Sequence, residues 1–255
     1  MARSTRPSVT RTITPKPPPT DARGNQIHNE LLIGLSAVDG VELLSKLEYV
    51  RLKVHSVLFE PGDSLKSVYF CNSGMISILT VFPDGKSVEV GLVGKEGFVG
   101  LPLLVGFQTS STRAVSQLEA TAFRVNGETL MALLPRCPEL GRQLQQYSEI
   151  CSMQITQIAA CNRLHEVHER LARWLLMCSD RVSSNHLALT QELLGQMLGT
   201  RRSSVTVSAG ILQKAGIITT GRGFVKIVDR KKLEEAACEC YGIMQRQASE
   251  WRTGS

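Results

Sequence analysis

Long hydrophobic runs are absent from this sequence of 255 residues. The most apolar stretch, residues 98–107, is interrupted by Gly100, Pro102 and Gly106. It is about half as long as a membrane-crossing helix, which needs about 20 residues. The N-terminus also lacks the apolar core of a secretory signal. We therefore expect no transmembrane helix, no membrane partner and a cytoplasmic location.

Cysteine is sparse and irregularly spaced. The seven cysteines stand at positions 71, 137, 151, 161, 178, 238 and 240. A disulfide scaffold would contain a denser and usually even set, so we expect mostly buried free thiols in a reducing compartment. Cys238 and Cys240 are closer together than a typical zinc pair, and His165 and His168 are more typical of a helix surface, so no metal site is predicted.

Positive charge is concentrated at the two ends of the chain. Residues 1–27 carry five basic residues and one acid, whereas residues 28–162 carry ten bases and thirteen acids. Residues 163–255 again carry an excess, with fourteen bases and nine acids. The basic C-terminal third is a candidate for binding a polyanion; the alternative is ordinary solvated surface charge.

Hydrophobic periodicity divides the chain into four segments. Residues 1–27 are rich in proline and predict a disordered basic tail. Residues 28–136 contain short runs of alternating apolar residues separated by turns such as Pro83-Asp84-Gly85, which predict an antiparallel β-roll whose last strand covers residues 116–125. Residues 137–162 repeat apolar residues every three or four positions, which indicates one long helix suited to pairing with its own copy.

The remaining segment, residues 163–255, contains the pattern that is most informative about function. Thr190 can cap a helix that ends at Gly199, and a second helix is expected from about Thr200 to Ala215. Val205, Ala209 and Leu212 would face inward on that second helix. This is helix–turn–helix geometry, in which the second helix enters the major groove of DNA. A generic helical hairpin is the alternative.

Two arginines and a hairpin strengthen the DNA-binding interpretation. Arg201 and Arg202 lie in the first helical turn, where a cation opposes the helix dipole by about 0.3–1 kcal/mol, and a phosphate or a guanine edge would offset that cost. Arg202, Ser203 and Thr206 are candidates for contacting base edges. Arg201 and two residues of a hairpin over residues 217–228 are candidates for contacting phosphate, namely Arg222 at the tip and Lys226 beside it. Asp229 is expected to cap one final helix with Leu233, Ala237, Tyr241 and Met244 inward.

Taken together, these motifs resemble the Crp/Fnr family of bacterial transcription regulators. The resemblance covers residues 28–245 and rests on Leu58–Asp63 and Ser73-Gly74 in the roll, and on Glu169–Leu175 and Leu189–Leu212 near the C-terminus. It implies an α+β protein with a jelly-roll-like sensor domain of the cyclic-nucleotide-binding type, a dimerisation helix and a winged helix–turn–helix. It also implies a homodimer on a near-palindromic operator in double-stranded DNA, with RNA polymerase as a candidate partner.

The expected effector site departs from the pattern of members that bind cyclic AMP. Arg113 matches the phosphate-pairing position and Gly100 belongs to the same cassette, but Leu101 replaces the ribose-binding glutamate and Ala114 lacks a hydroxyl. An unpaired ribose hydroxyl would cost about 1–3 kcal/mol, so cyclic AMP is not expected. Glu96 is a candidate substitute for the missing glutamate. Arg113 is expected either to bind another anion or nucleotide or to pair with an acid inside the roll.

Other classes of function are less well supported by the sequence. The iron–sulfur members of the family resemble one another in an N-terminal cysteine cluster, whereas the first cysteine here is Cys71, so no such cluster is expected. A regulator that binds DNA without a ligand and uses its roll only for dimerisation is one alternative. A nucleotide-processing enzyme that uses Arg113 and Glu96 is another, but no catalytic set with a local signature is present, so no enzyme is predicted.

Overall fold

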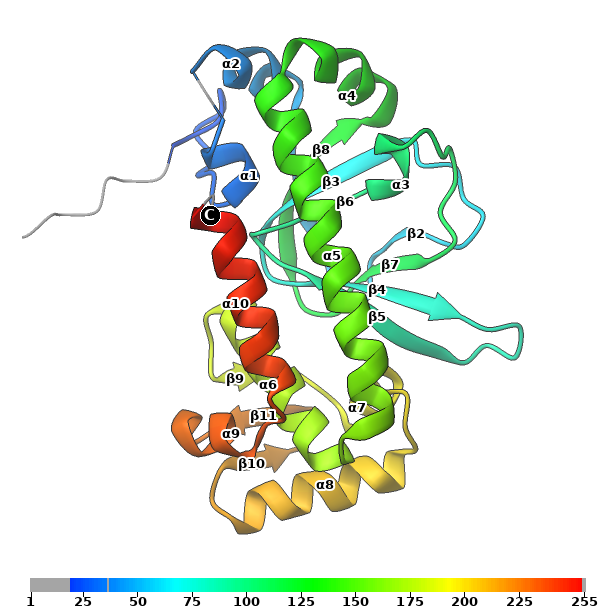
Figure 1. Ribbon diagram of the computed structural model, residues 1–255, viewed down its shortest axis with the longest axis vertical. Helices are drawn as coiled ribbons and strands as arrows, with labels where there is room; N and C mark the ends of the chain where they lie inside the picture. Colours follow the sequence, from blue (N-terminus) through cyan, green and yellow to red (C-terminus); the bar gives the residue numbers. More distant parts are fainter. Residues whose placement is uncertain (1–18, 36, 254–255) are drawn as a thin grey trace, which may run out of the picture.

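The computed structural model describes residues 19–35 and 37–253. A β-roll lies at one end of the molecule and a small helical domain with a β-hairpin lies at the other (Figure 1). The long helix α5 (Pro138–Leu164) runs past both of them. The predicted α+β class and the order of roll, long helix and helix–turn–helix are confirmed.

The N-terminal segment is more ordered than the sequence suggested. Thr20 and Gln26 form an antiparallel bridge, and Ile27 is buried in the core of the roll. The prediction of a disordered tail was therefore wrong for residues 19–27. The buried side chain of Ile27 holds this segment against the roll. The remainder of the predicted tail, residues 1–18, lies outside the described residues.

The roll consists of two antiparallel four-stranded sheets with the orders β1-β8-β3-β6 and β2-β7-β4-β5. Its strands are β1 (Glu48–Leu52), β2 (Val57–Phe59), β3 (Ser67–Ser73), β4 (Ile76–Val81), β5 (Ser87–Val93), β6 (Phe98–Val99), β7 (Arg113–Ser116) and β8 (Ala120–Asn126). One strand was expected over residues 116–125, but this stretch contains the end of β7, a short connection and most of β8. The chain leaves β7 in one sheet and enters β8 in the other within a few residues.

Short helices and the first half of α5 close the roll. The helices are α1 (Glu30–Ile33), α2 (Ala37–Lys46), α3 (Leu101–Leu104), α4 (Gly127–Leu133) and the 3-10 turn η1 (Leu134–Arg136). Leu140, Leu144 and Tyr147 of α5 are buried in the same core as the strands. The second half of α5 differs, since Ile155 and Leu164 are exposed.

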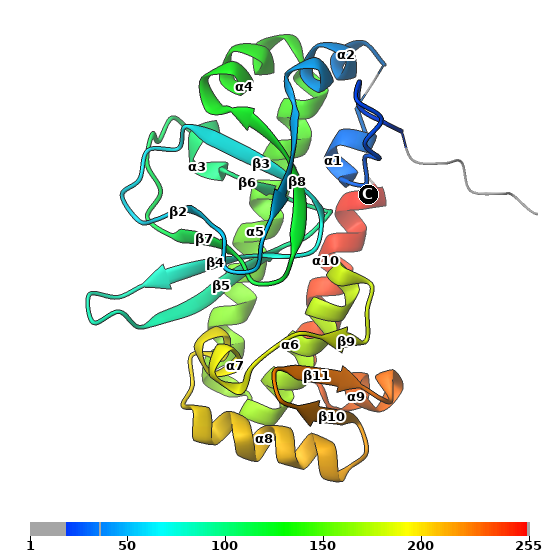
Figure 2. The same cartoon turned by 180° about the vertical axis from the view of Figure 1, so that it is seen from behind.

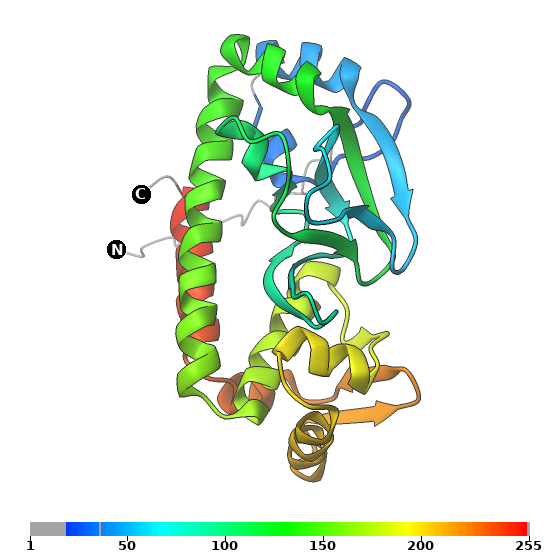
Figure 3. The same cartoon turned by 90° about the vertical axis from the view of Figure 1, so that its right-hand side faces the viewer.

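The C-terminal domain is built around the buried helix α6. Its elements are α6 (Val167–Val182), β9 (His186–Leu187), α7 (Gln191–Leu198), α8 (Arg202–Lys214), β10 (Ile218–Gly221), β11 (Phe224–Ile227), α9 (Arg230–Ala236) and α10 (Cys240–Thr253). Helix α10 runs back alongside α5 (Figures 2 and 3). The prediction of a single final helix after Asp229 was wrong. The chain leaves the helical conformation at Ala237 and re-enters it at Cys240, so that two helices are formed.

A buried carboxylate joins the roll to the C-terminal domain. Glu89 of β5 accepts hydrogen bonds from the Trp174 indole N–H of α6 and the Ser77 hydroxyl of β4, each at 2.6 Å. Burial raises the pKa of the Glu89 carboxyl to about 7, from an ordinary value of 4.5. The contact between the domains therefore contains an acid that titrates close to neutral pH.

Glu89 should make the stability of the protein depend on pH. Its carboxyl binds a proton more tightly in the folded than in the unfolded chain, so the free energy of unfolding should fall as the pH rises from about 4.5 to about 7. The contribution is up to about 3 kcal/mol. Glu89→Gln keeps an acceptor but cannot ionise, so its stability should change less across this range.

Chemical denaturation at several pH values between 5 and 8 measures this effect. Glu119→Gln, an exposed acid of the same domain, is the matched control and should follow the wild-type profile. A profile for Glu89→Gln as steep as that of the wild type would contradict the assignment.

Candidate nucleic-acid interface

Helix α7 begins and ends as its sequence predicts. The Thr190 hydroxyl accepts a hydrogen bond from the Leu193 backbone N–H at 3.1 Å, which caps the first turn. Leu194, Met197 and Leu198 are buried. Gly199 ends the helix with a φ of +60°, a left-handed conformation that glycine adopts at little cost. This turn sets the angle at which α8 leaves α7.

Helix α8 buries one face and exposes the other. Val205, Ala209 and Leu212 are at most 3% exposed and pack in the core around α6. The exposed face carries the predicted base-contacting residues Arg202, Ser203 and Thr206, together with Val207. The helix begins two residues later than expected, so that Arg201 is its N-cap and Arg202 its first residue.

The predicted hairpin follows α8. Strands β10 and β11 pair with Gly221 opposite Phe224, so that Arg222 and Gly223 form the turn. Gly223 has a φ of +82°, which the tight turn requires. Arg222 at the tip and Lys226 on β11 are both exposed. The structure therefore places these predicted phosphate-contacting residues on the surface of the hairpin. Strands β10 and β11 of this hairpin lie in the same domain as α8 (Figure 1).

The basic residues of this surface differ from those next to it. In the part of the chain that the structure describes, Arg201, Arg202, Arg222 and Lys226 form no ion pair. By contrast, two of the three basic residues of α9 are paired: Arg230 with Asp180 and Glu234, and Lys232 with Asp229. Moreover, α8 has no acidic residue in its first turn. Unneutralised positive charge therefore gathers at the start of α8 and on the hairpin.

Sequence reasoning missed one residue of this surface. The Thr206 hydroxyl donates a hydrogen bond to Gln191 Oε1 at 2.9 Å. Gln191 is the first residue of α7, and its amide therefore lies beside the exposed face of α8. No sequence spacing indicates this pairing, because it depends on the angle between the two helices.

The effector candidates of the roll do not form one site. Arg113 Nε contacts both carboxylate oxygens of Glu60, at 2.8 and 3.0 Å. Pairing with an acid inside the roll is thus the contact that Arg113 makes. Ala114 is buried on β7 opposite Ile78. Glu96 lies elsewhere and pairs with Arg181 of α6 at 2.9 Å.

Gly100 has a structural role that is independent of any ligand. Its φ is +128°, and a Cβ at this position would lie 2.3 Å from Val68 Cγ1. Gly100 also lines a cavity of about 240 Å³ between the roll and α5. Leu101, Phe98, Ile78 and Ile155 line the same cavity, which is mainly apolar.

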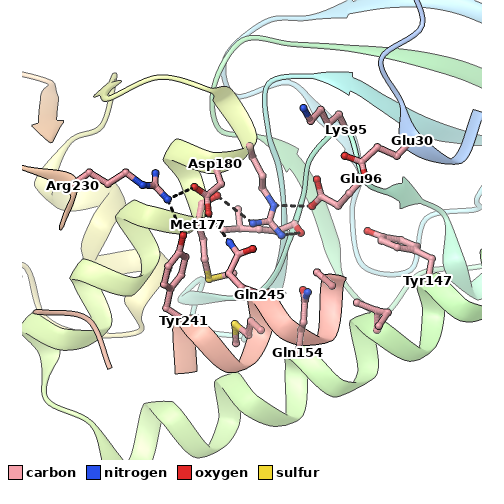
Figure 4. A pocket seen from close by; sticks show the side chains of 15 residues that line it. Glu30, Lys95, Glu96, Tyr147, Gln154, Met177, Asp180, Arg230, Tyr241 and Gln245 are labelled. Carbon is pink, nitrogen blue, oxygen red and sulfur yellow. Dashed lines mark hydrogen bonds and ion pairs between the residues drawn. The ribbon is translucent and has the colours of Figure 1, made fainter. Parts of the chain in front are cut away.

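A polar pocket of about 350 Å³ lies where α6, α10 and the roll meet (Figure 4). Asp180 of α6 accepts hydrogen bonds from Arg230 at 2.7 Å, from the Tyr241 hydroxyl at 2.9 Å and from Gln245 at 2.7 Å. Burial raises the pKa of Tyr241 to about 12. These contacts join α9 and α10 to α6. Each of the three partners lies at least 50 residues after Asp180 in the sequence.

Comparison with protein families agrees with this architecture. Residues 49–137 match the cyclic nucleotide-binding domain, and residues 169–236 match the Crp-like helix-turn-helix domain. The chain is 29% identical over 201 residues to the anaerobic regulatory protein of Haemophilus influenzae, with 70% of this chain and 72% of the relative covered. It is 25% identical to the fumarate and nitrate reduction regulatory protein of Escherichia coli, with 71% and 74% covered.

Solved structures share the fold. A transcriptional regulator of the Crp/Fnr type from Eubacterium rectale superimposes with a TM-score of 0.66 at 14% identity, covering 82% of this chain and 98% of that one. FixK2 from Bradyrhizobium japonicum gives a TM-score of 0.65 at 15% identity, covering 75% and 98%. The β-roll of the cyclic-nucleotide-binding type, the long helix and the helix–turn–helix together define a transcription regulator that carries a DNA-binding domain. The chain belongs to the Crp/Fnr family of such regulators.

In the described residues, no helix is both long and apolar enough to cross a membrane.

Two glycines of the helix–turn–helix should respond oppositely to alanine. Gly199→Ala places a side chain at positive φ and 2.9 Å from Val88 Cγ2, so the free energy of unfolding should fall by about 1 kcal/mol or more. Gly210 lies inside α8, and a Cβ added there would meet no atom within 4 Å. Gly210→Ala should therefore raise the free energy of unfolding by about 0.5–1 kcal/mol, because alanine favours the helix more than glycine does. Urea denaturation measures both, and changes of the same sign would contradict the described turn.

Proposed function

We propose that this protein is a homodimeric, sequence-specific transcription regulator that reads DNA with the exposed face of α8. The unpaired arginines at the start of α8 carry this proposal, because they add charge where the helix dipole already disfavours it and no acid compensates for them. Arginine pairs with guanine edges and phosphates through two hydrogen bonds, which would offset that cost. Arg202, Ser203 and Thr206 would contact base edges.

The hairpin would hold the domain on the DNA backbone. Arg222 and Lys226 are exposed on the same domain, and Arg201 precedes α8. Contacts with phosphate fix the position of a protein on the duplex but carry no sequence information of their own. Arg201, Arg222 and Lys226 would therefore contribute affinity that is similar for all sequences and that weakens with salt.

Helix α5 would form the dimer. It has 27 residues, and its second half leaves Ile155 and Leu164 exposed, although the first half is buried against the roll. Pairing of two such helices would cover these side chains. Dimerisation is typical of the family, and two copies of α8 would then read half-sites whose centres lie about 34 Å apart on a near-palindromic operator. RNA polymerase is a further partner for such a dimer in the cytoplasm.

The roll would sense an effector other than cyclic AMP. Leu101 lines the cavity between the roll and α5, and Arg113 is paired with Glu60. A ribose and a cyclic phosphate would lack the partners that they need in a mainly apolar cavity. A smaller or more apolar ligand fits this lining better. A roll that serves dimerisation alone is the second candidate, supported by the ion pair that already satisfies Arg113. A nucleotide-processing enzyme is not proposed, because Arg113 and Glu96 lie in different places.

Arg202→Ala and Arg222→Ala should have different effects on DNA binding. Loss of Arg202 should cost about 1–3 kcal/mol on the preferred sequence and relax the specificity at one base position. Loss of Arg222 should weaken binding to all sequences alike and lower the slope of log K against log salt by about 1.

Selection of bound fragments from random duplexes, followed by titrations at several salt concentrations, measures both effects. Lys53→Ala, an exposed cation of the roll, is the control and should leave both quantities unchanged. If Arg202→Ala and Arg222→Ala gave the same specificity and the same salt slope, the proposed division between base and phosphate contacts would be wrong.

Cyclic AMP should not stabilise the protein. A ligand at 100 times its dissociation constant adds about 2.7 kcal/mol to the free energy of unfolding, which a thermal-shift assay readily detects. We expect no shift with millimolar cyclic AMP. A shift that Arg113→Ala abolishes would show that the roll binds the nucleotide after all.

A further inference from the structure

Four side chains that are far apart in the sequence converge at the end of α5. The Sγ atoms of Cys161, Cys238 and Cys240 and a ring nitrogen of His165 all lie within 4.8 Å of one another. Cys161 belongs to the last turn of α5 and His165 is its C-cap, whereas Cys238 lies in the break between α9 and α10, and Cys240 is the first residue of α10. Three thiols and one imidazole form a known set of ligands for structural zinc.

Two distances within the cluster match those around one metal ion. Cys161 Sγ lies 3.5 Å from Cys238 Sγ, and Cys240 Sγ lies 3.6 Å from His165 Nδ1. Tetrahedral coordination, with zinc–sulfur bonds of about 2.3 Å and zinc–nitrogen bonds of about 2.0–2.1 Å, places neighbouring ligand atoms about 3.5–3.8 Å apart. A cluster of two or more irons would divide the ligands between metal atoms and spread them further.

These three cysteines are buried apart from the two hydrophobic cores. They are at most 4% exposed and form a small cluster of their own. Cys71 and Cys137 pack in the core of the roll, and Cys178 packs in the core around α6. A free thiol is usually buried as a small hydrophobic group among other apolar side chains. The separate cluster therefore needs another explanation.

The break between α9 and α10 supplies a second observation. No glycine or proline lies between Leu233 and Tyr241, and the sequence pattern predicts one continuous helix there. Residues two apart on a helix do not face the same side, so Cys238 and Cys240 could not both reach Cys161 from a continuous helix. Leaving the helical conformation at Ala237 lets both thiols point to one place.

Neighbouring groups orient the ligands as in metal sites. Glu239 accepts a hydrogen bond from His165 Nε2 at 3.1 Å, which leaves Nδ1 directed at Cys240. A carboxylate on the second ring nitrogen is the usual partner of a metal-bound histidine, since it fixes the ring and its tautomer. Gln157 donates a hydrogen bond to Cys240 Sγ at 3.0 Å.

Buried positive charge also lies beside the cluster. Arg170 and Arg173 of α6 are at most 7% exposed and interact electrostatically with Cys161 and Cys238. Their Nε atoms have no hydrogen-bond partner in the described structure. Three thiolates, one neutral imidazole and a divalent ion carry a net charge of −1, which would offset part of this buried charge.

We propose that Cys161, His165, Cys238 and Cys240 bind one Zn²⁺ ion. The four ligands close the coordination sphere, so the site is structural rather than catalytic. The ion ties the end of α5 to the chain between α9 and α10, at the point where only His165 and Glu166 separate α5 from α6. It therefore holds the junction between the dimerisation helix and the DNA-binding domain.

Metal analysis of the full-length, tag-free protein tests this proposal. After purification under reductant with zinc available, we expect about one zinc per chain. Replacement by Co²⁺ should give the strong visible bands of a tetrahedral cobalt site and the near-ultraviolet absorption of cobalt–thiolate bonds. Cys161→Ser and Cys240→Ser should lose the metal. Cys151→Ser, a half-buried thiol on the same helix, and His168→Ala are matched controls that should retain it.

A milder variant keeps the test independent of folding. Glu239 is exposed, so Glu239→Gln should fold normally. It should bind zinc about 10–100-fold more weakly in competition with a chromophoric chelator. Glu235→Gln, an exposed acid on α9, should bind like the wild type. An unchanged affinity in Glu239→Gln would contradict ligation by His165.

Other outcomes would overturn the proposal outright. These are less than a tenth of a zinc ion per chain, iron with a broad visible absorption in its place, equal metal loss in Cys151→Ser, and a Cys161–Cys238 disulfide that forms under reductant. None of these measurements involves DNA, so they are independent of the proposed regulatory function.

Discussion

Burial of Val205, Ala209 and Leu212 against α6 determines which face of α8 is presented to solvent. These side chains occupy the same core as Leu171 and Leu175. A rotation of α8 about its axis would expose them, and burying a large aliphatic side chain contributes about 1.5–3 kcal/mol. The exposed arginine, serine and threonine side chains are therefore fixed in direction by apolar contacts on the opposite side of the helix.

Contacts with the roll fix the position of the C-terminal domain, and with it the position of the exposed face of α8. Helix α5 contributes Leu140, Leu144 and Tyr147 to the core of the roll. Helix α6 contacts the roll through Trp174 and Glu89, and through Arg181 and Glu96. Glu89 and Trp174 are buried, and Arg181 and Glu96 are largely covered. Any change that separates the roll from α6 must therefore expose these polar groups to water or leave them without partners. A signal that alters the roll thus has a direct physical connection to the DNA-binding domain.

The cysteine–histidine cluster lies at the other side of the same junction. It joins the end of α5 to the start of α10, which then runs back along α5 and meets α6 through Asp180. Asp180 and the cluster therefore contact neighbouring residues at the start of α10, from α6 and from the end of α5 respectively. The position of α6 relative to α5 is accordingly supported by these contacts as well as by the hydrophobic core.

Much of this organisation follows from local patterns in the sequence. Alternating apolar residues predicted the roll, and the three-to-four spacing predicted α5. Thr190, Gly199 and the inward set of α8 predicted the helix–turn–helix, because caps, tight turns and amphipathic faces depend on residues only a few positions apart. The exposure of Arg202, Ser203, Thr206, Arg222 and Lys226 followed from the same short-range rules.

Only the tertiary structure decided the long-range pairings. Arg113 meets Glu60, Glu96 meets Arg181, and Cys161 meets Cys238 across 77 positions of sequence. It also decided that the helix expected after Asp229 breaks at Ala237, although local propensity favours its continuation. Side chains far apart in the chain are brought together by the packing of whole elements, and no local spacing encodes that arrangement.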